Sequence, residues 1–143
     1  REARLNMMST SMQGAIAFQK GLGCVHSLSH SLGGVDPRLH HGTLNAVFLP
    51  AVVRFNASAD SVRKENRLER MAHAMGLKSA SDIPDAIKAM NARLGLPKGL
   101  ATMGVQESQF SDVIRGALAD HCHKTNPRLA TPEDYREMLQ QSM

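Results

Sequence analysis

The 143-residue chain is predicted to be all-α, an irregular bundle of helices in a single domain. Its apolar residues recur at three- and four-residue intervals, which is the period of a helix with one buried face. No segment alternates apolar and polar residues as a half-exposed strand does, and glycine and proline separate the apolar stretches. A chain of this length is large enough to bury one core without disulfides or metals holding it together.

The first helix is predicted around Leu5, Met8, Met12 and Ile16, which form one apolar stripe. No capping residue precedes the stripe, and the chain opens at Arg1 without a Met. We interpret a helix whose apolar stripe starts without a helix-starting residue before it as a sign that the polypeptide has been cut at this point. Residues 1–143 are therefore expected to be a piece of a longer protein.

The next segment contains the residues most suited to chemistry. His26 and His30 are four positions apart, so both imidazoles would project from one face of a helix. Imidazole is a common metal ligand and titrates near neutral pH, so this pair suits metal binding or proton transfer. A pair of partly buried histidines without a ligand is the other interpretation. The doublet His40-His41 follows after one short loop and could supply a third imidazole.

Three more apolar or charged stretches predict helices with clear ends. The helix over residues 44–55 contains Pro50, which removes one backbone donor and crowds the carbonyl of Ala46. A single charged helix is predicted over residues 60–75, ending in a left-handed cap at Gly76. The stripe over residues 83–94 is closed by Gly95, with Pro97 beyond it.

The last two helices complete the predicted bundle. One is an apolar stripe over residues 110–118. The other begins at Thr131, which is followed by Pro132 and, three residues after the threonine, by the carboxylate of Asp134. An N-cap residue, a proline at the first helical position and a carboxylate at the third together predict a capping box.

Composition excludes several classes of function. The net charge is only +4, its basic residues are dispersed, and aromatic residues make up 3% of the chain, so a nucleic-acid-binding surface is not expected. The longest apolar run, residues 46–53, is interrupted by Pro50 and is too short to cross a membrane. Two cysteines allow at most one disulfide and suggest a reducing compartment, so a cytoplasmic protein is expected.

The histidine segment resembles a known family signature. Residues 21–34 follow the pattern G-x-x-H-x-x-x-H-x-x-G, and residues 41–50 follow H-G-x-x-x-A-x-x-L-P. Together they resemble the signature of the iron-containing (group III) alcohol dehydrogenases. Residues 110–113, Cys122 and residues 126–128 also resemble the closing helices of that family. The resemblance covers essentially all of the chain, but only the C-terminal, helical portion of the family's longer polypeptide.

The resemblance implies a role for each histidine. In this family an Asp and a His from a D-x-x-x-H helix hold one divalent metal together with two further histidines, which correspond here to His26 and His41. The loop before the H-G step is one residue longer than the common pattern, so His40 is the alternative to His41. His30 corresponds to a non-ligand histidine near the nicotinamide and the substrate, where it can relay a proton and contact the cofactor.

The same resemblance implies the cofactors and partners. The metal would be Fe²⁺ or Zn²⁺, the coenzyme NAD(P), and the substrate a small alcohol or aldehyde, in a protein that forms homo-oligomers. Cys122 and His123 belong to a stretch that lines the substrate pocket in the family, with ordinary core and surface positions as the alternative. Phe18, one or two turns before His26, is either a wall of the pocket or a core residue, and the core position is favoured. The chain would be the C-terminal helical domain of a two-domain dehydrogenase.

Two features expected of the complete enzyme are missing from the sequence. No D-x-x-x-H helix precedes the histidine segment, and Gly21-x-Gly23 lacks the third glycine and the preceding strand of a dinucleotide-binding fingerprint. A fragment with half of its metal ligands and no nucleotide-binding domain is expected to be inactive alone. The alternative function is a stand-alone helical module that binds a metal or a partner and catalyses nothing.

Overall fold

Helices and short 3-10 turns make up all of the regular structure. A computed structural model describes residues 1–143 and contains no strand, which confirms the prediction of an all-α fold. The α-helices are α1 (Glu2–Phe18), α2 (Cys24–Val35), α3 (His41–Asn56), α4 (Asp60–Lys64), α5 (Arg67–Ala74), α6 (Ile83–Arg93), α7 (Phe110–Ala119) and α8 (Pro132–Gln141). The 3-10 turns are η1 (Ala80–Asp82), η2 (Leu100–Met103), η3 (Glu107–Gln109) and η4 (His121–Thr125).

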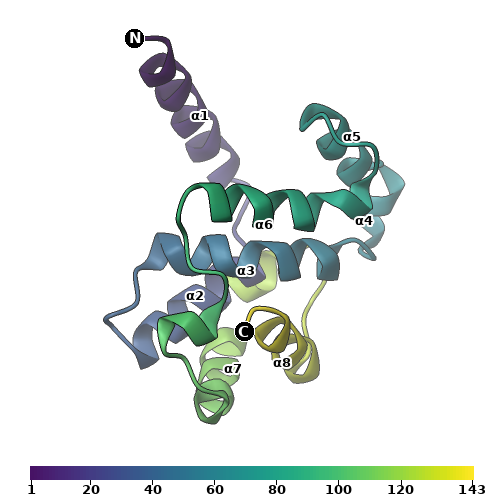
Figure 1. The fold of residues 1–143 in the computed structure, drawn as a ribbon. Helices are drawn as coiled ribbons and strands as arrows, with labels where there is room; N and C mark the ends of the chain where they lie inside the picture. The colour runs from purple at the N-terminus through teal and green to yellow at the C-terminus, as the bar shows by residue number, and fades with distance from the viewer.

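Four helices enclose the main core. Helix α2 packs against both α3 and α7, and α8 closes the group against α3 and α7 (Figure 1). The largest side chains sealed in this core are Phe48, Phe110 and Tyr135, with Leu28 and Leu32 on the inner face of α2. Burying such side chains is the main source of stability for the domain, and it fixes α2 and α3, the helices that carry the histidines.

Pro50 lies in the middle of α3 without interrupting it. A proline at this position leaves the carbonyl of Ala46 without its usual helical donor. The side chain of Asn91, on α6, donates to that carbonyl at 2.8 Å. A partly buried acceptor is thus satisfied by a neighbouring helix, which also ties α6 to α3.

The predicted single helix over residues 60–75 is wrong. The structure divides it into α4 and α5, because Asn66 between them adopts a left-handed conformation with φ 50°. Asparagine tolerates this conformation better than most residues since its short polar side chain bonds locally. The break lets Ala72 of α5 pack against Ile83 and Ile87 in a second, smaller core.

The predicted helix ends are confirmed. Gly76 and Gly95, which follow α5 and α6, both have φ 71°, a left-handed conformation that glycine adopts without strain. At the start of α8, the Thr131 hydroxyl accepts from the Asp134 backbone and the Asp134 carboxylate accepts from the Thr131 backbone. This is the capping box expected from the sequence.

Helix α1 stands apart from both cores. It forms over the predicted residues, but none of its side chains is buried, and it projects away from the bundle (Figure 1). Its apolar residues are exposed: Leu5, Met7, Met8, Met12, Ile16 and Phe18. None of the helices combines the length and the apolar character that a membrane span requires.

Candidate metal and substrate site

Three histidine rings from α2 and α3 form a triangle. His26 and His30 lie one turn apart on α2, and His41 is the first residue of α3. Their ring centroids are separated by 5.6 Å (His26 to His30), 5.3 Å (His26 to His41) and 5.2 Å (His30 to His41). The packing of α2 against α3 therefore brings together the three histidines singled out in the sequence.

Asn45 links two of these rings. It lies one turn after His41 on α3, and its Nδ2 is 3.3 Å from His26 Nε2 and 3.0 Å from His41 Nε2. Because an amide nitrogen only donates, both Nε2 atoms present lone pairs to the same point. The Oδ1 of Asn45 is buried and has no hydrogen-bond partner.

The neutral form of His26 is favoured by its surroundings. Burial, and then the proximity of His41 and His30, lower the pKa of His26 below its usual value of 6.5. On His41, Nδ1 is 3.3 Å from the hydroxyl of Ser29, which occupies the other ring nitrogen. Two imidazoles whose Nε2 atoms converge on one point are a donor set that suits Fe²⁺ or Zn²⁺.

His40 caps the start of α3. It precedes α3 as the N-cap residue, and its Nδ1 accepts from the backbone N–H of Thr43 at 3.3 Å. A ring nitrogen committed to capping its own helix is not presented to His26. The geometry therefore favours His41 over His40 as the partner of His26.

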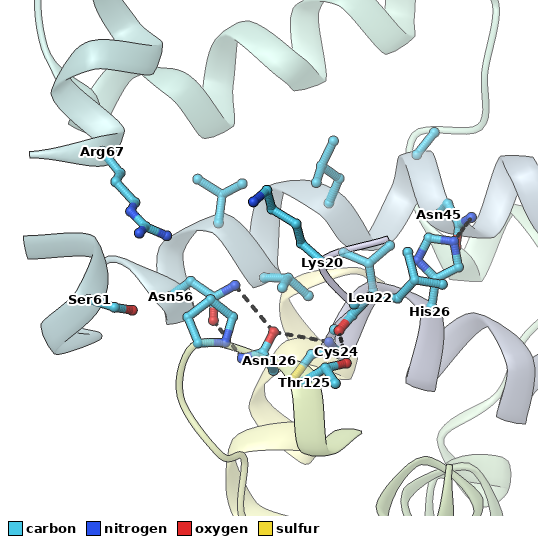
Figure 2. Close-up of a pocket in the computed structure, with 18 residues that line it drawn as sticks. Lys20, Leu22, Cys24, His26, Asn45, Asn56, Ser61, Arg67, Thr125 and Asn126 are labelled. Atoms are coloured by element: carbon cyan, nitrogen blue, oxygen red, sulfur yellow. Dashed lines mark hydrogen bonds between the residues drawn. The ribbon is translucent and has the colours of Figure 1, made fainter. Parts of the chain in front are cut away.

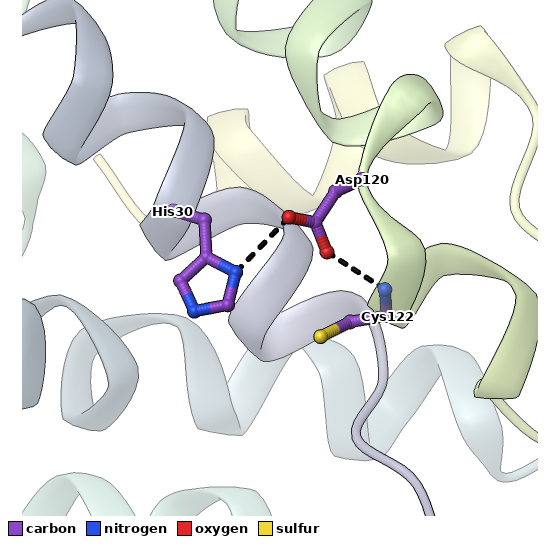
Figure 3. Close-up of side chains that lie close together, drawn as sticks. All are labelled: His30, Asp120 and Cys122. Carbon is purple, nitrogen blue, oxygen red and sulfur yellow. Dashed lines mark hydrogen bonds and ion pairs between the residues drawn. The ribbon is translucent and has the colours of Figure 1, made fainter.

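His30 is bonded to an acidic residue that the sequence did not identify. Its Nδ1 is 3.0 Å from Oδ2 of Asp120, which lies between α7 and η4 and is 14% exposed (Figure 3). The other carboxylate oxygen accepts the backbone N–H of Cys122 at 2.8 Å. Burial raises the pKa of Asp120, but the hydrogen bonds from Cys122 and His30 outweigh it, so the pKa is lowered and the carboxylate is ionised.

Cys122 is close to this pair but remains a thiol. Donor atoms of His30, Asp120 and Cys122 all lie within 4.8 Å of one another. Burial and the neighbouring Asp120 raise the pKa of Cys122 to about 11. In Figure 3 the Asp120 carboxylate lies between the ring of His30 and the backbone of Cys122 and is bonded to both.

The other two predicted pocket residues, Phe18 and His123, have different neighbours in the structure. Phe18 meets the ring of His26 edge-on at 5.7 Å and is 54% exposed, so the core position is excluded. His123 contacts α8, with its Nδ1 3.0 Å from the hydroxyl of Tyr135.

A cavity of about 720 Å³ opens beside His26 and Asn45 (Figure 2). One wall is α3, and the opposite side is the segment of residues 20–25 with residues 125–127. The Asn126 side chain accepts the first backbone N–H of α2, from Cys24, at 3.1 Å. The Thr125 hydroxyl donates to the carbonyl of Leu22. These bonds hold the glycine-rich segment in place as the floor of the cavity.

The sequence of this chain is similar to those of a known protein family. Residues 1–143 match the family described as "Fe-containing alcohol dehydrogenase family, C-terminal". A 4-hydroxybutyrate dehydrogenase from Cupriavidus necator is 63% identical across the whole chain, and an NAD-dependent methanol dehydrogenase from Bacillus methanolicus is 36% identical across 99% of it. The chain spans 38% of the length of each of these two relatives.

Solved structures give the same result. A crystal structure of 1,3-propanediol oxidoreductase superposes with a TM-score of 0.74 and 31% identity, over 85% of this chain and 33% of that one. An alcohol dehydrogenase from Oenococcus oeni superposes with the same TM-score and 29% identity, again over 85% of this chain and 33% of that one. In both, the matched part is the C-terminal domain of a two-domain enzyme. The chain therefore belongs to the iron-containing alcohol dehydrogenase family and corresponds to its C-terminal helical domain.

Proposed function

We propose that residues 1–143 are the metal- and substrate-binding domain of a longer NAD(P)-linked alcohol dehydrogenase or aldehyde reductase. The observation that carries the proposal is the convergence of His26 Nε2 and His41 Nε2 on the amide nitrogen of Asn45. The relatives named above act on methanol and 4-hydroxybutyrate, and each of these molecules carries a primary hydroxyl group.

His26 and His41 would hold the divalent metal, and the remaining ligands would come from residues outside 1–143. A catalytic site of this type needs at least three protein ligands and one open position. Lewis-acid polarisation of the substrate oxygen is the chemistry that the metal supplies, and hydride exchange with the substrate carbon is what NAD(P) supplies.

His30 would move the proton. With Nδ1–H donated to Asp120, the free Nε2 can accept the hydroxyl proton during oxidation and return it during reduction. Its ring stacks on that of His41 with an interplanar angle of 16°, so the residue that would carry the proton lies beside a residue that would bind the metal. Phe18, Cys122 and His123 remain predicted contacts of the substrate.

The proposal extends to the cellular compartment and to the association of α1 with further chain. Cys24 and Cys122 are both unpaired, which supports a reducing compartment such as the cytoplasm. The exposed apolar residues of α1 support association with further chain, either the remainder of the protein or a second copy.

The test uses the full-length gene product with NAD(P)⁺, short primary alcohols and either Fe²⁺ or Zn²⁺. Substituting His26→Ala or His41→Ala should reduce bound metal and turnover by orders of magnitude, because each removes one ligand. His73→Ala, on the exposed face of α5, is the matched control and should change neither. A His26→Ala enzyme that keeps its metal and its turnover would rule out the metal role, and metal loss in His40→Ala alone would move the second ligand to His40.

The isolated chain provides a second test. Residues 1–143 alone should show no turnover with the same substrates, because two imidazoles hold a metal weakly and hydride transfer requires a positioned nicotinamide. Measurable dehydrogenase activity from residues 1–143 would show that the chain is a complete enzyme.

A further inference from the structure

The hydroxyl of Ser29 lies between the two helices that carry the histidines. Ser29 is on α2 and is only 1% exposed, and its Oγ is 3.3 Å from Nδ1 of His41 at the start of α3. The same hydroxyl donates to the backbone carbonyl of His26, three positions earlier on α2, at 3.2 Å. Ser29 therefore touches the ring of one proposed metal ligand and the backbone of the other.

A count of hydrogens shows which group donates in the contact between Ser29 and His41. A hydroxyl has a single hydrogen, and that of Ser29 is directed to the carbonyl of His26. Its oxygen is then left to accept from Nδ1 of His41, so Nδ1 is the nitrogen that carries the hydrogen. A neutral imidazole has only one N–H hydrogen. The Nε2 of His41 therefore keeps the lone pair that binding to a metal requires.

The side chain of Asn45 agrees with this arrangement. Its Nδ2 is 3.0 Å from Nε2 of His41 and 3.3 Å from Nε2 of His26, and Figure 2 shows the bond to His26. An amide nitrogen has two hydrogens and no lone pair to offer, so one hydrogen is available for each ring. Both contacts of Asn45 thus require lone pairs, and not hydrogens, on the two Nε2 atoms.

The reverse arrangement of hydrogens would leave more polar groups without partners. If Ser29 donated to Nδ1 of His41, the hydrogen of His41 would lie on Nε2, and Asn45 would have to turn its oxygen toward the rings. Its amide nitrogen would then occupy the buried place where Oδ1 now has no partner. Two buried N–H donors without acceptors cost more than one buried oxygen without a donor. The arrangement with lone pairs on Nε2 is therefore favoured.

We propose that Ser29 is a positioning residue of the metal site, which holds His41 in the tautomer whose Nε2 can bind the ion. The inference rests on the proposed function, because it takes His41 as a metal ligand. It adds a residue that the family signature leaves unspecified, since Ser29 is the last of the three variable positions between His26 and His30. Groups that bond to the second nitrogen of a ligating histidine commonly set its orientation and its affinity for the metal.

The first experiment measures the affinity of the full-length gene product for Zn²⁺ by competition with a chelator. Ser29→Ala removes the acceptor of the His41 Nδ1–H, so affinity should fall by about 10-fold. Ser29→Thr keeps the hydroxyl and should retain most of the affinity. Ser27→Ala is the matched control, because Ser27 is equally buried on α2 and its hydroxyl has no hydrogen-bond partner. This control should bind Zn²⁺ as the wild type does.

The second experiment observes the tautomer itself in the metal-free, full-length protein labelled with ¹⁵N-histidine. The signals of His41 are those that are missing from the spectrum of His41→Ala. In the wild type and in Ser27→Ala, the ¹⁵N chemical shifts should place the hydrogen on Nδ1. In Ser29→Ala they should move toward the tautomer with the hydrogen on Nε2. A role of Ser29 in packing alone would lower stability without moving these shifts.

The outcomes separate the inference from the function on which it rests. If His41→Ala loses Zn²⁺ while Ser29→Ala keeps the wild-type affinity and the wild-type shifts, Ser29 has no positioning role, although the proposed metal site stands. If Ser27→Ala weakens binding as much as Ser29→Ala does, the effect belongs to any buried serine of α2, and the inference is again wrong. If His41→Ala binds Zn²⁺ as tightly as the wild type, the proposed function itself fails.

Discussion

Asp120 and His30 form the contact on which the proton-transfer role depends. The carboxylate accepts from His30 Nδ1 and fixes which ring nitrogen carries the hydrogen. Replacing Asp120 by Ala should therefore lower kcat of the full-length protein by about 10- to 100-fold, the usual effect of removing a group that orients a histidine. The KM of the substrate should change little, because Asp120 is not placed against the substrate. Steady-state kinetics with a short alcohol give both values.

Two variants make this prediction specific. Asp120→Asn keeps an oxygen acceptor for His30 and should recover part of the lost kcat. Asp112→Ala removes an aspartate that pairs only with Arg115 on the exposed side of α7, and it should behave like the wild type. Equal kcat values for Asp120→Ala and Asp112→Ala would show that His30 needs no orienting partner.

Cys24 predicts a pH dependence of stability. Burial raises its pKa from 9.0 to about 11, so the folded state holds the proton more tightly than the unfolded state. The stabilisation that this difference in pKa contributes is complete below pH 9 and is lost as the pH rises through about 11. The loss in the free energy of unfolding is about 2 kcal/mol, because a shift of one pKa unit corresponds to about 1.36 kcal/mol. Urea unfolding of residues 1–143 at pH 8 and pH 11 measures this loss, and Cys24→Ala should show a smaller one. The same loss in both proteins would assign the effect to other groups.

The residues of the site differ in how far sequence could identify them. His26, His30 and His41 were identified because helical spacing and a family signature are local patterns. Asn45 was overlooked, although it follows His41 by four positions and so had to lie on the same face of α3. No local pattern in the sequence marks Asp120 as a residue of the site. It meets His30 across 90 positions of sequence, a contact created only by the packing of α2 against α7.

At the scale of elements, that packing depends on Gly116. A Cβ at this position of α7 would overlap the hydroxyl of Ser31 on α2 and lie 3.1 Å from its Cβ. The same hydroxyl donates to the carbonyl of Val113 at 2.7 Å. Gly116→Ala should therefore destabilise residues 1–143 by about 1–2 kcal/mol, because Ser31 must move and its hydrogen bond is lost. Chemical denaturation measures the difference.

Gly33 is the matched control for this substitution. It lies within α2, and a Cβ there would meet nothing within 4 Å. Gly33→Ala should raise the free energy of unfolding by up to about 1 kcal/mol, the ordinary helix preference of alanine over glycine. Stabilisation by both substitutions would show that α2 and α7 are farther apart than the structure places them.

The ends of the helices could be predicted where their signals are local. The prediction was wrong where tertiary contacts decide where a helix ends. The cap at Thr131 and the glycine ends at Gly76 and Gly95 follow from side-chain and backbone preferences of a few neighbouring residues. Asn66 reads in the sequence as one more polar residue on a solvated helix. Its left-handed conformation accompanies the packing of Ala72 against Ile83 and Ile87 in the smaller core, and no local pattern encodes that contact.

At the scale of the whole molecule, α1 differs from every other long helix because nothing covers it. A helix of 17 residues that buries none of its side chains is marginally stable in water. In isolated residues 1–143, its amide protons should therefore exchange with solvent much faster than those of α2 and α3. In the full-length protein the exposed apolar residues of α1 would have further chain to pack against, so the same amides should be protected.

Deletion of α1 tests this independence directly. Removing residues 1–19 should change the free energy of unfolding of the remaining chain by less than about 0.5 kcal/mol, as for surface changes away from the core. Removing residues 131–143 should instead prevent folding, because α8 contributes Tyr135, Met138 and Leu139 to the main core. Circular dichroism and urea unfolding distinguish the two truncations. A loss of stability above about 2 kcal/mol on deleting α1 would mean that the helix packs against the bundle in solution, and that its exposed apolar face is not available to the rest of the protein.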